Sequence, residues 1–159
     1  MKRTANDAPL RARLRIPEAH RPRRVDVRKA LPAGASERAI QEQIRWWLAW
    51  LPWCVFWRNN VGLTPRADGG MVRYGLGVGS ADLIGIVYGT FVALEVKRPG
   101  GKVSDAQEKW IDLVWEKGGR AWVVSDVRTA LAHVANLGGS TLADTIAEAE
   151  RAAGGRVPE

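Results

Sequence analysis

The sequence is poor in the residues that bind metals through sulfur or imidazole. Its 159 residues include one cysteine, Cys54, and two histidines, His20 and His133. A single cysteine cannot form an internal disulfide, and these three residues are too few for a Cys/His zinc cluster. Cys54 lies between Trp53 and Val55, so we expect it to be a small buried hydrophobic residue and not a reactive thiol.

Long apolar runs are missing as well. None approaches the roughly 20 residues that a membrane span requires. No apolar stretch follows the basic N-terminus, as it would in a secretory signal. We therefore expect no membrane association. With 46% hydrophobic and 26% charged residues, the composition is that of a soluble globular protein, and the length fits one domain.

The excess positive charge of the chain is confined to its N-terminus. Residues 1–30 contain ten Lys/Arg and three Asp/Glu, a net charge of +7, whereas the remaining residues contain fourteen of each. This segment also has three prolines and few large apolar residues, so it cannot bury enough surface to fold alone. Residues 1–35 are therefore predicted to be a flexible basic arm that binds a polyanion by releasing counterions. The alternative is an extension that only adds solubility or was wrongly assigned to the protein.

Apolar periodicity predicts the first elements of a folded domain after this arm. A helix is expected between Ser36, a good N-cap, and Pro52, with apolar residues at helical spacing along one face. Residues 53–58 are predicted to form a strand. A long loop over residues 59–79 follows, with six glycines and two arginines. Such a loop either folds over a nucleic-acid backbone or is a disordered connection.

The second half of the chain alternates predicted helices with one strand. A helix begins at Ser104, with Trp115 among its inward residues, and ends at Gly118-Gly119. A strand is expected over residues 121–125, and a helix capped by Asp126 runs to about residue 137. A last helix, rich in Ala and Glu, is expected over residues 140–153.

Eight tryptophans are many for this length. Five of them cluster around the first predicted helix and strand, and we expect most of these to be in the core: Trp46, Trp47, Trp50, Trp53 and Trp57. One helix face cannot bury Trp46, Trp47 and Trp50 together, because these positions point in different directions. An exposed member would stack on a base or pack at a dimer interface. We favour the interface.

The chemistry of the chain is concentrated in residues 80–97, a predicted β-hairpin. Two apolar runs rich in β-branched and aromatic residues flank Tyr88-Gly89, which is placed where the turn should be. Asp82, Glu95 and Lys97 are the only charged residues of the stretch. Charged groups in such strands cost free energy unless they are paired or ligated, which argues against the alternative that they only decorate an exposed face.

The register of this hairpin determines which charged groups meet. If Tyr88-Gly89 is a two-residue loop, Asp82 lies directly opposite Glu95, whereas a longer loop would shift the pairing, and Tyr-Gly is a weak signal for the short loop. Opposed residues have Cβ atoms about 4.5–5.5 Å apart, so the carboxylates would repel each other. Lys97 points the same way as Glu95. A divalent cation would relieve the repulsion, and oxygen ligands suit Mg²⁺.

Several segments around this hairpin resemble the VRR-NUC family of the PD-(D/E)XK nuclease superfamily. Their order matches the family across about residues 36–126. The matching segments are Ser36-Glu-Arg-Ala-Ile-Gln41, Trp57-Arg-Asn-Asn-Val-Gly62, Gly79-Ser-Ala-Asp-Leu-Ile-Gly85, Glu95-Val-Lys97, Ser104-Asp-Ala-Gln107 and Gly118-Gly-Arg-Ala-Trp-Val-Val124. The residue before the family's aspartate is usually proline, and here it is Ala81, which changes backbone stiffness but not ligand chemistry.

The resemblance implies a restriction-endonuclease-like αβββαβ core, in which helices flank a mixed sheet, with extra C-terminal helices. Residues 36–159 would form this nuclease domain and its helical extension. The resemblance also implies dependence on Mg²⁺ or Mn²⁺ and phosphodiester hydrolysis, with DNA or RNA as the partner. Stand-alone copies of the domain are common in bacteriophage genomes, which indicates the cytoplasm of a bacterial or phage-infected cell. Small nucleases of this core often act as homodimers to cut both strands.

The resemblance also points to supporting residues. Glu37 matches an acid of the first helix that helps to hold a metal or its water, although an acid in a first helical turn is also favoured by the helix dipole. Glu42 is an alternative. Gln107 matches a glutamine near the active site, but Ser104 and Gln107 are also spaced as a capping box. We expect that one side-chain conformation of Gln107 cannot serve both purposes.

The predicted site therefore has three groups of residues. The catalytic group is Asp82, Glu95, Lys97, Glu37 and Gln107. The metal ligands are the carboxylates of Asp82 and Glu95 and the carbonyl of Val96. The nucleic-acid contacts are Arg58, Asn59, Arg66, Arg73, Arg98 and Lys102.

We expect a metal-dependent endonuclease that hydrolyses phosphodiester bonds in DNA, with a preference for branched or nicked substrates. The main alternative is a nucleic-acid-binding protein that keeps the nuclease fold without turnover. Opposed carboxylates argue against it, because a protein that only binds nucleic acid has no need of them. A more remote alternative is a basic-armed structural protein of a virus particle.

Overall fold

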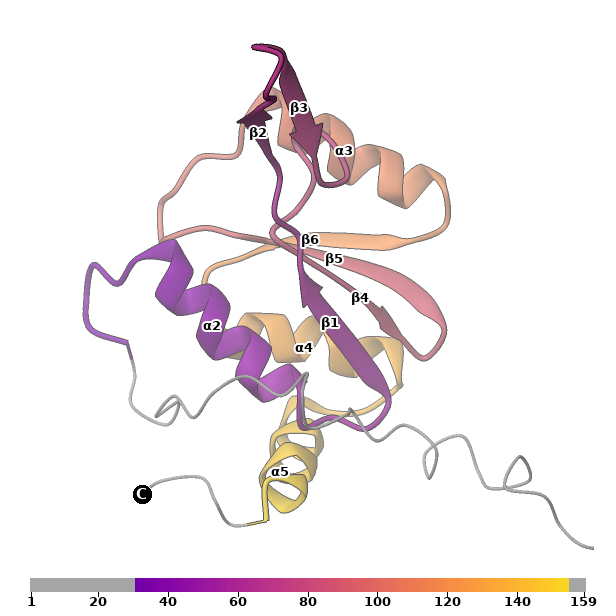
Figure 1. Cartoon of the computed structure of the whole chain (residues 1–159). Coiled ribbons are helices and arrows are strands. Elements are labelled where there is room, and N and C mark those ends of the chain that lie inside the picture. Colours follow the sequence, from indigo (N-terminus) through magenta and orange to yellow (C-terminus); the bar gives the residue numbers. More distant parts are fainter. Residues whose placement is uncertain (1–30, 155–159) are drawn as a thin grey trace, which may run out of the picture.

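The computed structural model describes residues 31–154, which form a four-stranded sheet with helices on both faces (Figure 1). Most of the predicted arm therefore lies outside the described residues. The elements in chain order are α2 (Glu37–Leu48), β1 (Cys54–Arg58), β2 (Gly62–Pro65), β3 (Met71–Tyr74), β4 (Leu83–Val87), β5 (Thr90–Val96), α3 (Asp105–Glu116), β6 (Arg120–Val124), α4 (Val127–Leu137) and α5 (Leu142–Ala152).

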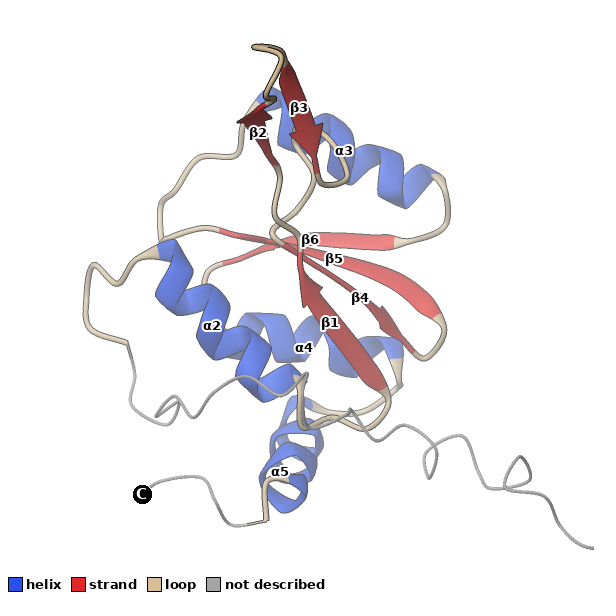
Figure 2. Ribbon diagram, in the orientation of Figure 1, coloured by secondary structure: helices blue, strands red, loops and turns tan. Residues whose placement is uncertain are grey.

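The main sheet has the strand order β1-β4-β5-β6. The β1–β4 and β4–β5 pairs are antiparallel, and β5 pairs with β6 in parallel after the crossover through α3. Helices α2 and α4 cover one face of this mixed sheet and α3 covers the other (Figure 2). The order α2-β1-β4-β5-α3-β6 is the αβββαβ core of a restriction-endonuclease-like fold, so the predicted fold class is confirmed, including the extra helices α4 and α5.

The hairpin of β4 and β5 has the predicted two-residue loop. Tyr88 and Gly89 have φ angles of 46° and 83°, the positive values that a type I′ turn requires. A positive φ is unusual for a tyrosine, and the ring stacks on Trp53 with centroids 4.8 Å apart. The register pairs Val87 with Thr90, as predicted, and one step beyond the last paired residues it places Asp82 opposite Glu95.

The segment 59–79 is not a plain loop, which corrects the prediction. It contains a second hairpin, in which β2 pairs antiparallel with β3 from Gly62 opposite Tyr74 to Pro65 opposite Met71. The sequence signal for it is Asp68-Gly69 between two runs of strand-forming residues, a combination typical of hairpin turns. This hairpin stands apart from the main sheet (Figure 1), and its side chains are largely exposed.

The tryptophans of the first helix are less exposed than expected. Trp46 and Trp47 are both buried, with their rings packed edge to face at 5.7 Å, and Trp50 is partly buried. For the helix the prediction of an exposed member was wrong, because α2 contacts both the sheet and α4, so more than one of its sides is covered. Trp57 in β1, the exposed member of the group, has 43% of its surface exposed. Trp115 was expected to point inward, and it is 43% exposed.

The predicted helix caps and the burial of Cys54 are largely confirmed. The Ser36 side chain accepts a hydrogen bond from the Ala39 N–H and caps α2. The last helix is capped by Thr141, one residue later than expected. Cys54 is buried with its thiol 3.3 Å from the Leu48 carbonyl oxygen. Within residues 31–154 no helix has the length and apolar character needed to cross a bilayer.

Candidate active site

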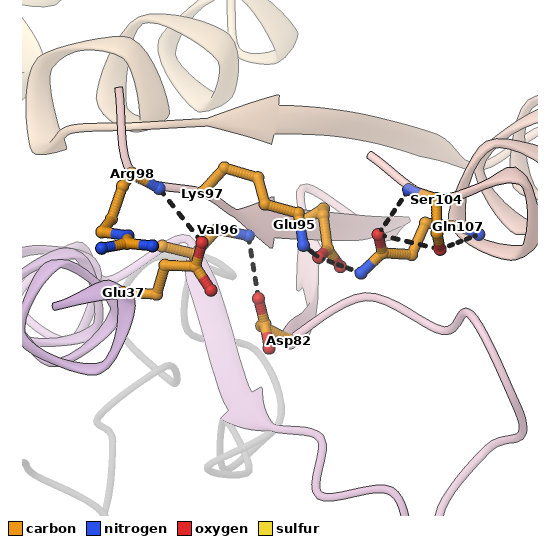
Figure 3. A network of polar contacts seen from close by, with 8 residues as sticks. All are labelled: Glu37, Asp82, Glu95, Val96, Lys97, Arg98, Ser104 and Gln107. Atoms are coloured by element: carbon orange, nitrogen blue, oxygen red, sulfur yellow. Dashed lines mark hydrogen bonds and ion pairs between the residues drawn. The ribbon is translucent and has the colours of Figure 1, made fainter. Parts of the chain in front are cut away.

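The candidate site lies where β4 begins and β5 ends, beside the first turns of α2 and α3 (Figure 3). Hydrogen bonds and one ion pair link the residues of the predicted catalytic group to one another or to the strand end between them. These residues are Glu37, Asp82, Glu95, Lys97 and Gln107. They are spread over 71 positions of the chain, from 37 to 107, and the fold brings them to one edge of the sheet.

Asp82 stands immediately before β4. Its Oδ2 accepts a hydrogen bond of 3.0 Å from the backbone N–H of Val96 on β5, so the carboxylate is fixed across the hairpin (Figure 3). Its backbone carbonyl accepts from the N–H of Asn59 at 2.8 Å. Gly79 allows the incoming chain to pass close to α3, because a Cβ at this position would collide with the carbonyl of Ala106. Asp82 is therefore positioned by three separate elements.

Glu95 is the most buried acidic residue of the site, with 2% of its surface exposed. Its Oε1 lies 2.8 Å from Nζ of Lys97 and also accepts a hydrogen bond from Nε2 of Gln107. Burial raises the pKa of the Glu95 carboxyl, and the negative charges of Asp82 and Glu37 raise it further, against the opposing effect of Lys97. A nearby positive charge therefore stabilises the ionised form of Glu95.

Lys97 shares its face of the strand with Glu95, and its side chain is 15% exposed. Burial alone lowers the pKa of the ammonium group, but the hydrogen bond to Glu95 and the charges of Glu95, Glu37 and Asp82 outweigh it. The net pKa is above the usual value. With these neighbours Lys97 is protonated at neutral pH and can donate hydrogen bonds.

Gln107 makes both of the contacts that the sequence placed in competition. Its Oε1 accepts from the backbone N–H of Ser104 at 2.9 Å, which completes a capping box at the start of α3. Its Nε2 donates to Glu95. The expectation that one conformation cannot do both was wrong, because the oxygen and nitrogen of an amide point in different directions (Figure 3).

The structure distinguishes between the two candidate acids of the first helix. Oε1 of Glu37 accepts a hydrogen bond of 3.3 Å from the backbone N–H of Arg98, directly after β5. Glu42 instead pairs with Arg38 on the surface of α2, at 3.3 Å. Glu37 is therefore the acid that borders the site, and its contact holds the first turn of α2 against the end of β5.

A comparison with protein families agrees with this geometry. The family model of the VRR-NUC domain matches residues 35–128, more than half of the chain. This chain belongs to the VRR-NUC family. The family is a nuclease family of the PD-(D/E)XK superfamily, and the matched span includes the whole catalytic group and the four-stranded sheet. No curated protein matches the chain significantly.

The predicted nucleic-acid contacts of the VRR-NUC domain lie at several places around the site. Arg58 ends β1, and Arg98 and Lys102 follow β5; all three are exposed. Arg66 and Arg73 lie on the β2–β3 hairpin, and Arg66 has Asp68 at 4.0 Å. These positions agree with contacts to a bound polyanion but do not form one cluster with the catalytic group.

Asn59 differs from the other predicted contacts because its side-chain donors are used within the protein. Its amide nitrogen donates to the Ser80 hydroxyl at 2.8 Å and to the Ala81 carbonyl at 2.9 Å. Ser80 also donates to the Gly77 carbonyl. In this structure Asn59 holds the segment that enters β4, which was not expected from the sequence. Its contact with a nucleic acid stays a prediction.

The oxygen atoms of the site fit a hard divalent cation. Across the described part of the chain, no group of three or more His, Cys, Asp or Glu side chains is arranged to hold a metal. The donors present are the carboxylates of Asp82 and Glu95 and the carbonyl of Val96. Mg²⁺ is commonly held by one or two carboxylates with water and substrate oxygens completing its shell. This donor set therefore suits Mg²⁺ or Mn²⁺ and does not suit zinc.

Two polar residues of α2 close to this site were not predicted from the sequence, the buried Gln41 and the partly buried Arg45. They follow Glu37 at intervals of four residues and therefore continue the same stripe of the helix. That spacing was the available signal. Both have buried polar atoms with no hydrogen-bond partner in the described structure.

Proposed function

We propose that this VRR-NUC domain is a metal-dependent endonuclease that hydrolyses phosphodiester bonds in DNA. The observation that supports this most strongly is the buried Glu95, which borders Asp82 and Lys97 at the mouth of the hairpin. A buried carboxylate with a second carboxylate opposite it is costly unless a cation is present, and Lys97 supplies only one charge. A site of this composition is suited to the hydrolysis of a phosphodiester bond.

Asp82, Glu95 and the Val96 carbonyl would hold Mg²⁺ or Mn²⁺. When bound there, such an ion polarises the scissile phosphate and lowers the pKa of an attacking water. Asp82 is held in place by the Val96 N–H, and Glu95 by Gln107, so both carboxylates are oriented before the substrate arrives. Glu37 borders the site as a further acceptor for the hydrogens of water.

Lys97 would act as a hydrogen-bond donor to the reacting phosphate or to the attacking water. As an ammonium group it would stabilise the negative charge that develops in the transition state. In the overall reaction the water oxygen bonds to phosphorus and one phosphorus–oxygen ester bond breaks. The products are a phosphomonoester end and a hydroxyl end.

Residues outside the catalytic group would bind the rest of the substrate. Arg58, Arg98 and Lys102 are exposed beside the site, and Arg66 and Arg73 extend this region along the β2–β3 hairpin. That hairpin also exposes apolar side chains, with Leu63 at 54% and Met71 at 57%. Exposed apolar surface beside the site supports either contact with unpaired bases of branched or nicked DNA or pairing with a second subunit.

A second candidate function is nucleic-acid binding without turnover. One feature favours it: the carboxylate of Glu95 is already satisfied by Lys97 and Gln107, and Asp82 by Val96, so the cluster is hydrogen-bonded without a metal. A protein that only binds would use these residues to hold the ends of the strands together.

A cleavage panel separates these functions. The full chain is incubated with Holliday junctions, flaps, nicked duplex and single strands, each with Mg²⁺, with Mn²⁺ and with chelator. We expect cleavage that requires the metal and is lost in Asp82→Asn, a variant that keeps an acceptor for the Val96 N–H. Asp68→Asn on the exposed hairpin is the matched control and should cleave normally. Binding of all substrates with no cleavage under any condition would favour the second candidate.

A further inference from the structure

A second polar cluster lies beside the catalytic group and takes no part in it. Gln41 and Arg45 are one turn apart on α2, and Arg58 ends the neighbouring strand β1. Gln41 is 5% exposed, and its Oε1 is buried without a hydrogen-bond partner among residues 31–154. The Nε of Arg45 is buried in the same way. Such groups destabilise a fold unless something outside the described chain satisfies them.

The charges of this cluster have the same sign. Burial lowers the pKa of the Arg45 guanidinium, and the charge of Arg58 lowers it further, with Glu42 acting in the opposite direction. Arg45 takes part in no ion pair of the described structure, because Glu42 pairs with Arg38. Among residues 31–154 neither Arg45 nor Arg58 takes part in an ion pair, so the two like charges favour a bound anion.

The cluster adjoins the catalytic group at two places, through Arg58 on β1 and through Gln41 on α2. Arg58 is paired with Leu83, the residue directly after Asp82. On α2, Glu37 precedes Gln41 by one turn and contacts the end of β5. Figure 1 shows α2 and β1 lying next to each other, with the start of α2 and the end of β1 both directed toward the site. An anion held here would be close to the reacting phosphate but separate from it.

We propose that Gln41, Arg45 and Arg58 bind a backbone phosphate of the nucleic acid next to the one that is cleaved. The proposal rests on the proposed nuclease function. Guanidinium groups match the geometry of phosphate oxygens, and the pair supplies the charge. The Gln41 amide supplies a neutral donor after half a turn about its last bond, which exchanges the positions of oxygen and nitrogen. Binding of a phosphate at this site would fix the position of the nucleic-acid strand relative to Asp82.

A buried water between Gln41 and Arg45 is the competing explanation. It would satisfy both unpartnered atoms, but it would leave the repulsion between Arg45 and Arg58 uncompensated. The two explanations differ in what a substitution does. If a structural water fills the site, a substitution there should lower the stability of the protein and leave nucleic-acid binding unchanged. If the site binds a phosphate, the substitution should weaken nucleic-acid binding and leave the stability unchanged.

The test measures binding without turnover. Full-length protein with the Asp82→Asn substitution is titrated with labelled duplex DNA, single-stranded DNA and RNA of the same sequence at several salt concentrations. We expect Arg45→Met to weaken binding about tenfold, as for loss of a charge-assisted hydrogen bond. It should also reduce the slope of log K against log salt by about 0.9 on duplex DNA, as for one lost phosphate contact. Arg151→Met, an exposed arginine on α5, is the control for the charge change.

Gln41→Leu separates the two explanations. It replaces an unpartnered amide by an apolar group of similar size, so the melting temperature should stay the same or rise while affinity falls about threefold to tenfold. A lower melting temperature with unchanged affinity would overturn the proposal in favour of a structural water. Unchanged affinity and salt slope in Arg45→Met would overturn it as well.

Two further outcomes keep this proposal distinct from the nuclease function. If the α2 variants do not fold, Arg58→Met at an exposed strand end gives the same measurement, and an unchanged salt slope there overturns the proposal. A wild-type chain that binds but does not cleave would refute the nuclease function and leave the phosphate site to be judged by its variants. A chain that binds no nucleic acid would overturn both.

Discussion

Gln107 donates a hydrogen bond to Glu95 from the first turn of α3, while the other end of the same amide caps that helix. The start of the helix and the buried carboxylate are therefore positioned by one side chain. A change that disturbs the cap also disturbs the site. This relationship makes it possible to test the two functions of Gln107 separately.

Gln107→Glu should separate capping from catalysis. Glutamate also completes a capping box at this position, so α3 should keep its N-terminal cap. The melting temperature of the protein, measured with the metal bound, should therefore be largely unchanged. The new carboxylate no longer donates to Glu95 and repels it. We expect cleavage to fall about 10–100-fold, as is usual when a residue that orients a metal ligand is changed. Thermal melting and single-turnover kinetics measure the two effects. Normal cleavage in this variant would show that Gln107 is only a cap.

Metal binding should stabilise the protein through Asp82 and Glu95. A ligand present at 100 times its dissociation constant stabilises the folded state by about 2.7 kcal/mol. For a protein of this size each kcal/mol shifts the melting temperature by about 2–4 °C. Saturating Mn²⁺ should therefore raise the melting temperature of the wild type by several degrees. Mn²⁺ should raise the melting temperatures of the Glu95→Gln and Asp82→Asn variants much less. An equal rise in both variants would place the metal elsewhere.

Lys97→Ala should keep metal binding and lose rate. Removing one donor to the transition state typically lowers the rate about 10²–10³-fold. Lys97→Arg should recover little of this, because a planar guanidinium does not replace a compact ammonium. Titration calorimetry with Mn²⁺ and single-turnover cleavage check both statements. If metal affinity collapsed while turnover stayed normal, Lys97 would be a structural partner of Glu95.

His133 should make stability fall in mild acid. Burial lowers the pKa of its imidazole, and the ring stacks on Trp122 with centroids 4.5 Å apart. The unfolded chain takes up a proton near pH 6.5, before the folded chain does. The stability is therefore complete above about pH 6.5 and decreases as the pH falls toward the folded-state pKa. His133→Phe should reduce the fall in melting temperature between pH 7.5 and 5.5 relative to the wild type.

Deletion of residues 1–30 should weaken nucleic-acid binding and flatten its salt dependence. The deletion removes the whole net charge of +7. Each phosphate contact that is lost lowers the slope of log K against log salt by about 0.9 on duplex DNA. These residues contribute none of the proposed ligands, so single-turnover cleavage at saturating enzyme should remain. The same salt slope before and after deletion would exclude the arm as a contact.

Local sequence signals were sufficient for the elements that depend on neighbouring residues. The two-residue turn at Tyr88-Gly89 sets the pairing of β4 with β5, so it also places Asp82 opposite Glu95. The caps at Ser36 and Ser104 start helices within one turn of themselves. The αβββαβ core and the supporting residues at its edge were implied by the resemblance to the VRR-NUC family and not by these local signals.

Only the tertiary structure decided which groups meet across long sequence separations. Trp46 and Trp47 are both buried because α2 packs against the sheet and α4. Asn59 is committed to Ser80 and Ala81 across the inserted β2–β3 hairpin. On α2 the Oε1 of Gln41 and the Nε of Arg45 are buried without a hydrogen-bond partner among residues 31–154.

The physical reason for this division is the range of the interactions. Turn geometry, capping and strand alternation depend on a few adjacent residues, so the sequence by itself determines them. Burial and hydrogen-bond partners depend on how distant segments fill the space around a side chain. The same glutamine or arginine is therefore a solvated surface group or a buried member of a site according to what packs against it.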